Sequence, residues 1–351
     1  MKPIIGITMG DPAGIGSEII VKALKSGKLQ EKCAPVVIGD RQAMLEANAF
    51  CGAGLALREI GSPRQAEGEP GTIEMMDLGL LAPGSFVYKK VQKLCGEASF
   101  QYIIKGIELA LAGDIQAVVT GPINKEALNA AGRNYSGHTE IFADYTGTKN
   151  YTMLLMSKTL RVFHVTTHCA MREACDKITR ERVLEVIRLA RAGMGLLGFA
   201  SPRIAVAGLN AHSSENGLFG REEGLAIIPA VRDAVSEGIN ADGPVPPDTV
   251  FVKAQSGAYD AVVAMYHDQG HIPVKLSGFA LDAATNRYTS VGGVNCTIGL
   301  PIIRASVDHG TAFGKAGEGR ANEESLVDAV EAALTMAKNR KGGDSSTGRP
   351  A

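Results

Sequence analysis

Three histidines stand where separate β-strands are expected to end. His168, His212 and His267 each follow a short apolar run of β type, in VFHVTTH, IAVAGLNAH and AVVAMYH. A strand delivers its last side chain to one edge of a sheet, so three such ends can supply three imidazoles to one divalent ion, with a fourth position open for substrate. A single histidine at a strand end is more often a hydrogen-bonded structural residue. The histidines therefore indicate a catalytic metal site only together with other motifs.

Two glycine-containing segments are expected to join a strand to a helix. GDPAGIGSE, at 10–18, lets backbone amides approach a ligand near a helix N-terminus, with a structural tight turn as the alternative. It lacks the third glycine of GxGxxG, so a Rossmann dinucleotide fold is not supported. TGPINKEAL, at 120–128, places Lys125 in the first turn of a helix, which is unfavourable with the helix dipole unless an anion lies nearby. A solvated lysine is the alternative there.

Two further segments concentrate polar side chains. SGHTE, at 136–140, offers His138 and Thr139 as hydrogen-bond donors for a phosphate or carboxylate. YHDQGHIPVK, at 266–275, follows the apolar run AVVAM and carries two histidines, a carboxylate, an amide and a lysine. So many polar groups are costly to bury without a role, and we therefore expect this segment to be functional.

A glycine-rich loop, SVDHGTAFGKAGEGRAN at 306–322, is the candidate cofactor site. It resembles the loop with which isocitrate and isopropylmalate dehydrogenases hold the adenosine half of their nicotinamide cofactor. The resemblance implies that the cofactor contacts in this chain are His309, Gly310, Thr311, Ala312 and Asn322.

Short β-rich runs alternate with helical patterns along the chain. PIIGITM, APVVIGD, AVVTG, RIAVAGL and AVVAMYH are the expected strands, each of the first four followed by an expected helix. This alternation predicts an α/β fold with a largely parallel sheet covered by helices on both faces. The polar segments 62–72 and 240–248 are expected to be surface connections.

Size and composition narrow the class of protein. A chain of 351 residues is expected to form about two domains. Its net charge of −1 gives no excess of positive charge that would bind nucleic acid or an anionic membrane. No run approaches a membrane span or a signal peptide, so a cytoplasmic location is expected. The six cysteines have no zinc-ribbon spacing and are expected to be free thiols. Cys169 follows His168, but neighbouring side chains of an extended segment point to opposite faces, which argues against a shared site.

With these motifs in hand, the chain resembles the PdxA family, the 4-hydroxythreonine-4-phosphate dehydrogenases. The likeness runs through ITMGDPAGIGSE, VVTGPINK, SGHTE, VTTH, GLNAH, PPDTVF, AMYHDQG and GVNCTIGLPIIRASVDHGTA. It covers nearly everything except the tail, and YHDQG with SVDHGTA is a highly specific pair.

The resemblance implies a role for particular residues. His168, His212 and His267 would be the metal ligands, and Asp248 matches a position beside the substrate. The implied contacts to the phosphorylated substrate are His138, Thr139, Lys275, Asn295 and Arg304.

The resemblance also implies the architecture. It predicts two α/β/α domains, like those of isopropylmalate dehydrogenase, with the site in a cleft between them. We expect the first domain at 1–140 and 300–340, the second at 141–299, and a disordered tail at 341–351. The protein would be a homodimer whose partner subunit completes the site.

One departure from the biosynthetic members points to a branch of the family. An insertion of about eleven residues, at 280–291, lies between Lys275 and Asn295, and HDQGHIPVK carries an additional His271. Both features resemble the catabolic branch, PdxA2, which acts on D-threonate or D-erythronate 4-phosphate.

The hypothesis for the reaction is metal-dependent oxidation by NAD or NADP of the C3 hydroxyl of a four-carbon 4-phosphorylated hydroxy acid, followed by decarboxylation. For 4-phospho-D-threonate or 4-phospho-D-erythronate the product is dihydroxyacetone phosphate. Zinc, cobalt, manganese and magnesium are all candidates for the ion. Asp248, Asp268 and Lys275 are candidate proton acceptors, and Asp268 is the better candidate for orienting a ligating imidazole.

Four alternatives stay open on the sequence alone. The first is 4-phosphooxy-L-threonine dehydrogenase of pyridoxal phosphate synthesis, and the second is a dehydrogenase of cis-dihydrodiol dicarboxylates, which needs no phosphate site. The third is a phosphate acyltransferase, which needs neither nicotinamide nor a metal held by three histidines. The last is a non-catalytic binding protein, which would bind ligand without turnover.

Overall fold

The computed structural model describes residues 2–283 and 287–340, and the chain divides into two compact units. Unit 1 comprises Met1–Thr148 and Leu300–Ala337, and unit 2 comprises Lys149–Gly299 with residues 338–340. The predicted tail, 341–351, and three positions of the predicted insertion, 284–286, lie outside the described residues.

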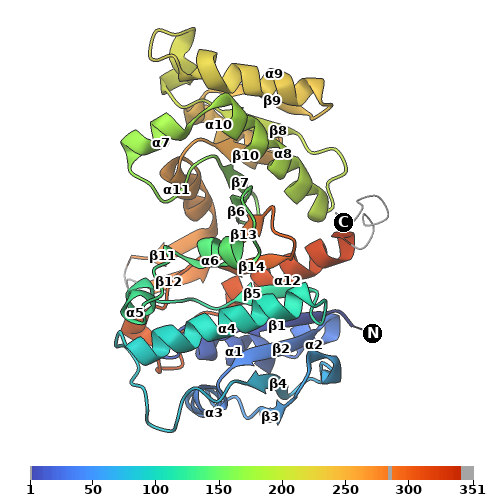
Figure 1. Cartoon of the computed structure of the whole chain (residues 1–351), viewed down its shortest axis with the longest axis vertical. Coiled ribbons are helices and arrows are strands. Elements are labelled where there is room, and N and C mark those ends of the chain that lie inside the picture. Colours follow the sequence, from blue (N-terminus) through green and yellow to red (C-terminus); the bar gives the residue numbers. More distant parts are fainter. Residues whose placement is uncertain (1, 284–286, 341–351) are drawn as a thin grey trace. The chain divides into compact units, whose positions relative to one another are not determined.

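Unit 1 is built on six parallel strands, in the spatial order β3-β4-β2-β1-β5-β14 (Figure 1). Their bounds are β1 Ile4–Thr8, β2 Ala34–Gly39, β3 Ala56–Glu59, β4 Thr72–Asp77, β5 Ala117–Thr120 and β14 Arg304–Val307. Every residue of β2, β5 and β14 is buried, as expected for parallel strands that are covered on both faces.

The helices of unit 1 include the three that the alternation predicted, at 16–25, 41–50 and 125–130. They are α1 Gly16–Lys25, α2 Lys28–Lys32, α3 Arg41–Phe50, α4 Lys93–Leu111, α5 Lys125–Ala130, α6 His138–Tyr145 and α12 Glu324–Arg340, with short 3₁₀ turns η1 Pro63–Gln65 and η4 Phe313–Lys315. The long helix α4 lies across β1, β2 and β5 (Figure 1). Gly96 lets it approach α5 closely, because a Cβ there would lie 2.0 Å from the Ala127 carbonyl oxygen.

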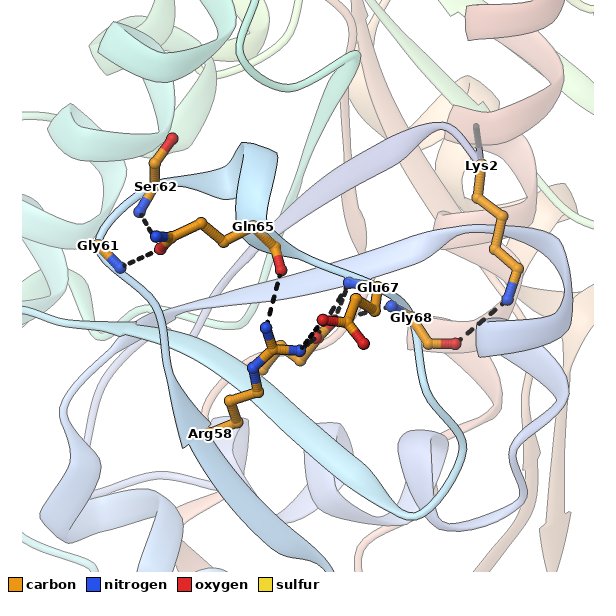
Figure 2. A network of polar contacts seen from close by, with 8 residues as sticks. Lys2, Arg58, Gly61, Ser62, Gln65, Glu67 and Gly68 are labelled. Carbon is orange, nitrogen blue, oxygen red and sulfur yellow. Dashed lines mark hydrogen bonds and ion pairs between the residues drawn. The ribbon is translucent and has the colours of Figure 1, made fainter.

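A polar network fixes the outer edge of this sheet (Figure 2). Glu74 of β4 is 2% exposed, and its carboxylate accepts the N–H groups of Glu67 (3.0 Å) and Gly68 (2.9 Å). It also accepts a guanidinium N–H of Arg58 at 2.9 Å, and Arg58 donates to the Gln65 carbonyl at 3.2 Å. Both oxygens of the buried carboxylate therefore have partners, and the connection between β3 and β4 is held in place.

Unit 2 has a mixed sheet in the order β13-β6-β7-β10-β8-β9. The strands are β6 Thr152–Met156, β7 Arg161–His164, β8 Ile204–Ala207, β9 Ala241–Val245, β10 Ala261–Ala264 and β13 Val294–Ile298. β7, β10, β8 and β9 are parallel neighbours, whereas β6 is antiparallel to both β7 and β13. A separate two-stranded antiparallel sheet, β11 Phe279–Asp282 with β12 Arg287–Val291, is formed by described residues in and beside the predicted insertion.

Helices and turns follow most strands of unit 2. They are α7 Met171–Lys177, α8 Arg180–Leu196, η2 Ala211–Glu215, η3 Glu223–Ile227, α9 Ile228–Ser236, α10 Pro247–Gln255 and α11 His267–Gly278. An apolar core lies between them and includes Leu155, Val162, Ala205 and Val262. Among the described residues, no helix is both long enough and apolar enough to cross a membrane.

The predicted α/β class is confirmed, and the five predicted strands are β1, β2, β5, β8 and β10. The prediction that 240–248 is a surface connection was wrong, because Ala241–Val245 form β9. β9 is the last strand of its sheet. An edge strand tolerates proline, since one side of its backbone makes no ladder hydrogen bonds, and the prolines of this segment therefore did not exclude a strand.

Candidate active site

Three neighbouring parallel strands of unit 2 lead to the three predicted metal ligands. β7, β10 and β8 lie side by side in that order, and His168, His267 and His212 come after their respective ends. The register pairs Ala264 with His164 and Val263 with Val206, so the carboxyl ends of the strands meet at one edge. In open α/β sheets this edge is where ligands bind.

His168 and His267 lie together at this edge. Their ring centroids are 5.9 Å apart, and both line a pocket of about 370 Å³. The other lining residues are Thr167, Cys169, Met171, Ala174, Tyr266 and Asp268. Cys169 shares the pocket with His168, contrary to the expectation from an extended segment, because the chain turns there and the Cys169 N–H donates to the Thr167 carbonyl at 2.9 Å.

The surroundings of His267 restrict its ring. Its Nδ1 lies 2.6 Å from a carboxylate oxygen of Asp268, which leaves Nε2 as the nitrogen for a ligand. His271, one helical turn further along α11, stacks on the same ring at 3.6 Å between centroids and 12° between planes. Burial, followed by the charges of His164 and His267, lowers the pKa of His271 to about 3, so this second imidazole is neutral at physiological pH.

His212 lies on a strained turn. Residues 212–216 all have positive φ, between 44° and 65°, although none of them is glycine. The turn is anchored by Glu223, a buried carboxylate that accepts the N–H groups of Leu209 (2.8 Å) and Asn210 (2.7 Å). Nδ1 of His212 lies 3.6 Å from a carboxylate oxygen of Asp248, so a predicted ligand and a predicted catalytic residue are neighbours.

The structure thus places the three histidines after adjacent strands and brings two of them to one pocket. Across residues 2–283 and 287–340, no three His, Cys, Asp or Glu side chains converge closely enough to hold a metal ion. The imidazole donors and the carboxylate on Nδ1 of His267 are nevertheless the groups that zinc and related ions use in proteins. The assignment of the three ligands stays a prediction.

Unit 1 gathers part of the predicted phosphate site around the start of α6. His138 begins this helix, and Arg304 of β14 lies with its guanidinium carbon 5.7 Å from the ring centre of Phe142. Arg304 is 2% exposed and donates to the Thr120 hydroxyl at 3.1 Å. Burial, then the charges of Arg304 and Lys125, hold the pKa of His138 well below its usual range. Both cations therefore lower the pKa of the same imidazole, which is neutral.

Lys125 is a member of this group that was not assigned to the site from sequence. A Cβ on Gly137 would lie 4.0 Å from the Lys125 side chain, so Lys125 reaches the turn that carries His138 and the buried Thr139. The sequence did show a lysine in the first turn of an expected helix. That pattern also fits a solvated lysine, so it did not assign Lys125 to the site.

The other two predicted substrate contacts belong to unit 2. Lys275 lies on α11, two turns after His267, with its ammonium 5.0 Å from the ring centre of Phe279. Asn295 lies on β13, opposite Leu155 of β6.

The predicted cofactor loop packs against the GDPAGIG segment in unit 1. The Ile15 N–H donates to the Thr311 carbonyl at 3.1 Å, and Gly14 allows this approach, since a Cβ there would lie 2.9 Å from the Thr311 side chain. Ala312 has a left-handed φ of 45°, and Asn322 accepts the Glu324 N–H at 2.7 Å.

His309 and Gly310 complete the loop, with Nδ1 of His309 3.0 Å from the Gly310 carbonyl. In the GDPAGIG segment, which packs against this loop, Asp11 is fully buried, and burial raises its pKa to about 6 against the opposing hydrogen bond from Ala13. Sequence reasoning gave Asp11 no role, although an acidic residue in an apolar strand–helix turn was a visible signal.

Comparison with known proteins gives a consistent result. The matching family model is "Pyridoxal phosphate biosynthetic protein PdxA", over residues 31–333. D-Threonate 4-phosphate dehydrogenase of Cupriavidus necator is 45% identical over 339 residues, covering 96% of this chain and 98% of that protein. The protein of the same name from Salmonella typhimurium is 46% identical over 335 residues, covering 95% and 98%. The crystal structure of 4-hydroxythreonine-4-phosphate dehydrogenase from Klebsiella pneumoniae matches with a TM-score of 0.84 and 43% identity, covering 96% and 98%.

These three similar proteins are all named as 4-phosphate dehydrogenases, and the chain is an enzyme of the dehydrogenase class. Within that class, the chain belongs to the PdxA family, as its motifs predicted.

Proposed function

We propose that the protein oxidises the C3 hydroxyl of a four-carbon 4-phosphorylated hydroxy acid, 4-phospho-D-threonate or 4-phospho-D-erythronate, with NAD or NADP. The observation that carries the proposal is the pair His168 and His267 in one pocket, with Asp268 on the second nitrogen of His267. The similarity to proteins named D-threonate 4-phosphate dehydrogenase supports the choice of substrate.

His168, His212 and His267 would hold a divalent ion. Such an ion supplies Lewis acidity, which stabilises negative charge on the substrate oxygens during oxidation and decarboxylation. The chain's own contribution is to fix the imidazoles. Asp268 accepts from Nδ1 of His267, and His271 packs against the ring, so the ligating nitrogen is held in one orientation.

The proposed contacts to the phosphate group are the five that the family resemblance implies: His138, Thr139, Lys275, Asn295 and Arg304. Arg304 suits this role because it is fixed by Thr120 and because a guanidinium binds phosphate oxygens in bidentate fashion. Burial and the neighbouring cations lower the pKa of His138, so its imidazole is neutral. A neutral imidazole has one N–H, which would donate a hydrogen bond to the phosphate.

The proposed reaction has two steps, an oxidation and a decarboxylation, and atoms and electrons balance in each. In the first, hydride leaves C3 for the nicotinamide, and the hydroxyl proton passes to a base, for which Asp248 and Lys275 are the candidates. In the second, the bond between C1 and C2 breaks, carbon dioxide leaves, and the electron pair remains on the C2–C3 enolate. A proton then adds to C2, and dihydroxyacetone phosphate results.

The nicotinamide cofactor would contact the loop formed by His309, Gly310, Thr311, Ala312 and Asn322. The fixed packing of Thr311 on Gly14 and the left-handed backbone of Ala312 support a preformed loop.

A homodimer is part of the proposal. Ile272 and Leu276 lie one turn apart on α11 and are 58% and 78% exposed, an apolar face that suits a second copy of the chain. Light scattering after size exclusion should give twice the chain mass. A mass of one chain would remove the dimer from the proposal.

A substrate panel tests the proposed function. Formation of reduced nicotinamide would be followed with 4-phospho-D-threonate, 4-phospho-D-erythronate and 4-phosphooxy-L-threonine, each with NAD or NADP and with or without a chelator. Chelator-sensitive turnover of either phosphorylated hydroxy acid is expected. Turnover of the amino substrate alone would indicate the pyridoxal phosphate pathway. If all three substrates fail, oxidation of a cis-dihydrodiol dicarboxylate is the remaining dehydrogenase activity to test.

A further inference from the structure

Met265 is the point at which the histidine-bearing segments of unit 2 meet. It is the first residue after β10, is fully buried, and precedes His267 by two positions. The segment that leads to His168 bonds to its carbonyl, because Thr166 donates both its N–H (3.2 Å) and its hydroxyl (2.9 Å) to that oxygen. The carbonyl of Met265 is thus tied to the segment of one predicted ligand.

Gln269 makes the corresponding connection on the other side. Its side-chain oxygen accepts the Met265 N–H at 2.7 Å, and its side-chain nitrogen donates to the Gly208 carbonyl at 2.8 Å. Gly208 is the first residue after β8, and the chain reaches His212 four residues later. One amide group therefore joins the backbone that leads to His267 to the backbone that leads to His212.

The same row of contacts continues to the next strand. The Gly208 N–H donates to the Val245 carbonyl at 2.9 Å, and Val245 is the last residue of β9, which leads to Asp248. The ends of β7, β10, β8 and β9 are thus connected in their spatial order by hydrogen bonds.

Burial makes the Gln269 bonds hard to replace with water. Gln269 is 8% exposed and Met265 is not exposed at all. The carboxamide offers an acceptor to Met265 and a donor to Gly208 from one side chain. An apolar residue would leave a buried N–H and a buried carbonyl without partners, and a carboxylate would face the Gly208 carbonyl with no proton to donate.

We propose that Gln269 and Thr166 are positioning residues for the metal site, which through Met265 hold the segments of His168, His212 and His267 in one register. Neither residue needs to touch the ion. The proposal rests on the proposed function, because the register matters only if the three histidines bind one ion. Substitution of a residue that orients a metal ligand without touching the ion typically weakens metal binding by about 10- to 100-fold.

The first test compares Gln269→Met with Gln30→Met. Gln30 is the matched control, because it is 1% exposed and donates a buried hydrogen bond to the Leu24 carbonyl at 3.1 Å in unit 1. Cobalt(II) affinity would be measured by competition with a chromophoric chelator, together with the visible spectrum of the bound ion and the Tm of the metal-free protein. We expect about 10-fold weaker cobalt binding and an altered spectrum in Gln269→Met only, with a lower Tm in both variants.

A second pair of variants keeps the proposal testable if Gln269→Met does not fold. Thr166→Val preserves shape and removes the hydroxyl bond to Met265, whereas Thr166→Ser restores a hydroxyl. We expect weaker cobalt binding in the valine variant and recovery in the serine variant.

Each outcome decides between the two proposals. Wild-type affinity and spectrum in Gln269→Met would overturn the positioning role and leave the metal ligands standing. Equal weakening in Gln30→Met would also overturn it, since the effect would then be a general loss of stability. Wild-type protein that binds no cobalt would instead overturn the ligand assignment of the proposed function, and the positioning role would fall with it.

Discussion

Two buried carboxylates of unit 1, Glu74 and Asp11, differ in how completely they are hydrogen bonded. Glu74 accepts from the backbone of Glu67 and Gly68 and from Arg58, so both its oxygens have partners (Figure 2). Asp11 accepts the Ala13 N–H at 2.8 Å through one oxygen, and its other oxygen has no hydrogen-bond partner within the described part of the chain.

The difference follows the position of each residue in the fold. Glu74 lies on β4, next to the edge strand β3 and away from the segments that carry the predicted site. Asp11 follows β1, next to the turn after β5, and its N–H donates to the Pro122 carbonyl at 2.9 Å. A buried carboxylate whose oxygens all accept hydrogen bonds stabilises a fold. A buried carboxylate with an oxygen that lacks a hydrogen-bond partner costs stability, and such a group is a candidate for a functional site.

Unit 2 shows the same contrast. Glu223 is completely engaged by the backbone of Leu209 and Asn210 and by the Asn210 side chain, and it supports a turn of left-handed residues. By contrast, two of the histidines that follow strand ends, His168 and His267, line a pocket. We therefore expect substitutions at the fully bonded carboxylates to change the free energy of unfolding, and substitutions at the predicted metal ligands to change kcat/KM.

The largest effect is expected at a predicted metal ligand. His267→Ala should lower kcat/KM by about 10³-fold, or about 4 kcal/mol, because the ion that stabilises the developing negative charge would be lost. Steady-state kinetics on the metal-loaded protein measures this. Since His267 is partly exposed, Tm should change little, and activity within a factor of two of wild type would exclude it as a ligand.

Asp11→Asn should stabilise the protein in a pH-dependent manner. Burial raises the pKa of Asp11 from 3.8 to about 6, so its ionised form destabilises the folded state. The stability that Asp11 contributes is present below about pH 4 and is lost as the pH rises through about 6. At pH 8 the variant should therefore be more stable by about 3 kcal/mol, and the advantage should vanish near pH 4. Chemical denaturation at both pH values checks this, and an equal difference at both would contradict the assigned pKa.

Arg304→Lys should act on substrate binding. A lysine keeps the charge but loses the planar guanidinium, so KM for the phosphorylated substrate should rise about 30-fold, or about 2 kcal/mol, with a smaller change in kcat. Arg133→Lys is the matched control, because Arg133 makes a bidentate pair with Glu97 at 2.8 and 2.9 Å elsewhere in unit 1. If both variants raise KM alike, Arg304 has no specific role in binding phosphate.

Glu74→Gln should show the smallest effect and only on stability. The amide nitrogen of glutamine would face backbone N–H groups, and we expect a loss of about 1 to 2 kcal/mol in the free energy of unfolding. KM and kcat should stay at their wild-type values. A change in KM would show that the outer edge of the sheet is coupled to the site, and the contrast with Asp11 would fail.

The periodicity of the apolar residues and the histidines expected at strand ends predicted the fold class, five strands and the positions of three candidate ligands. The alternation of apolar runs and helical patterns gave β1, β2, β5, β8 and β10, because those strands are buried on both faces and are read as short apolar runs. The positions of His168, His212 and His267 after strand ends followed from the same pattern.

Other features depend on contacts that local sequence does not encode. β9 contains glycine and proline and is a strand only because it lies at an edge. The left-handed turn at 212–216 has no glycine and is held by Glu223, thirteen residues beyond Asn210. The partner of Gln269, Gly208, lies 61 residues away in the chain, so the hydrogen bond that links two histidine segments is a property of the sheet order.

We propose above all that His168, His212 and His267 together hold one divalent ion. The most direct measurement is the amount of zinc or cobalt bound per chain after dialysis, in wild-type protein and in His212→Ala, with circular dichroism as the control for folding. His212 is the decisive residue, because the structure places it beside Asp248 rather than in the pocket of the other two. We predict about one ion per chain for the wild type and almost none for the variant. A folded His212→Ala protein that binds as much metal as the wild type would contradict the account.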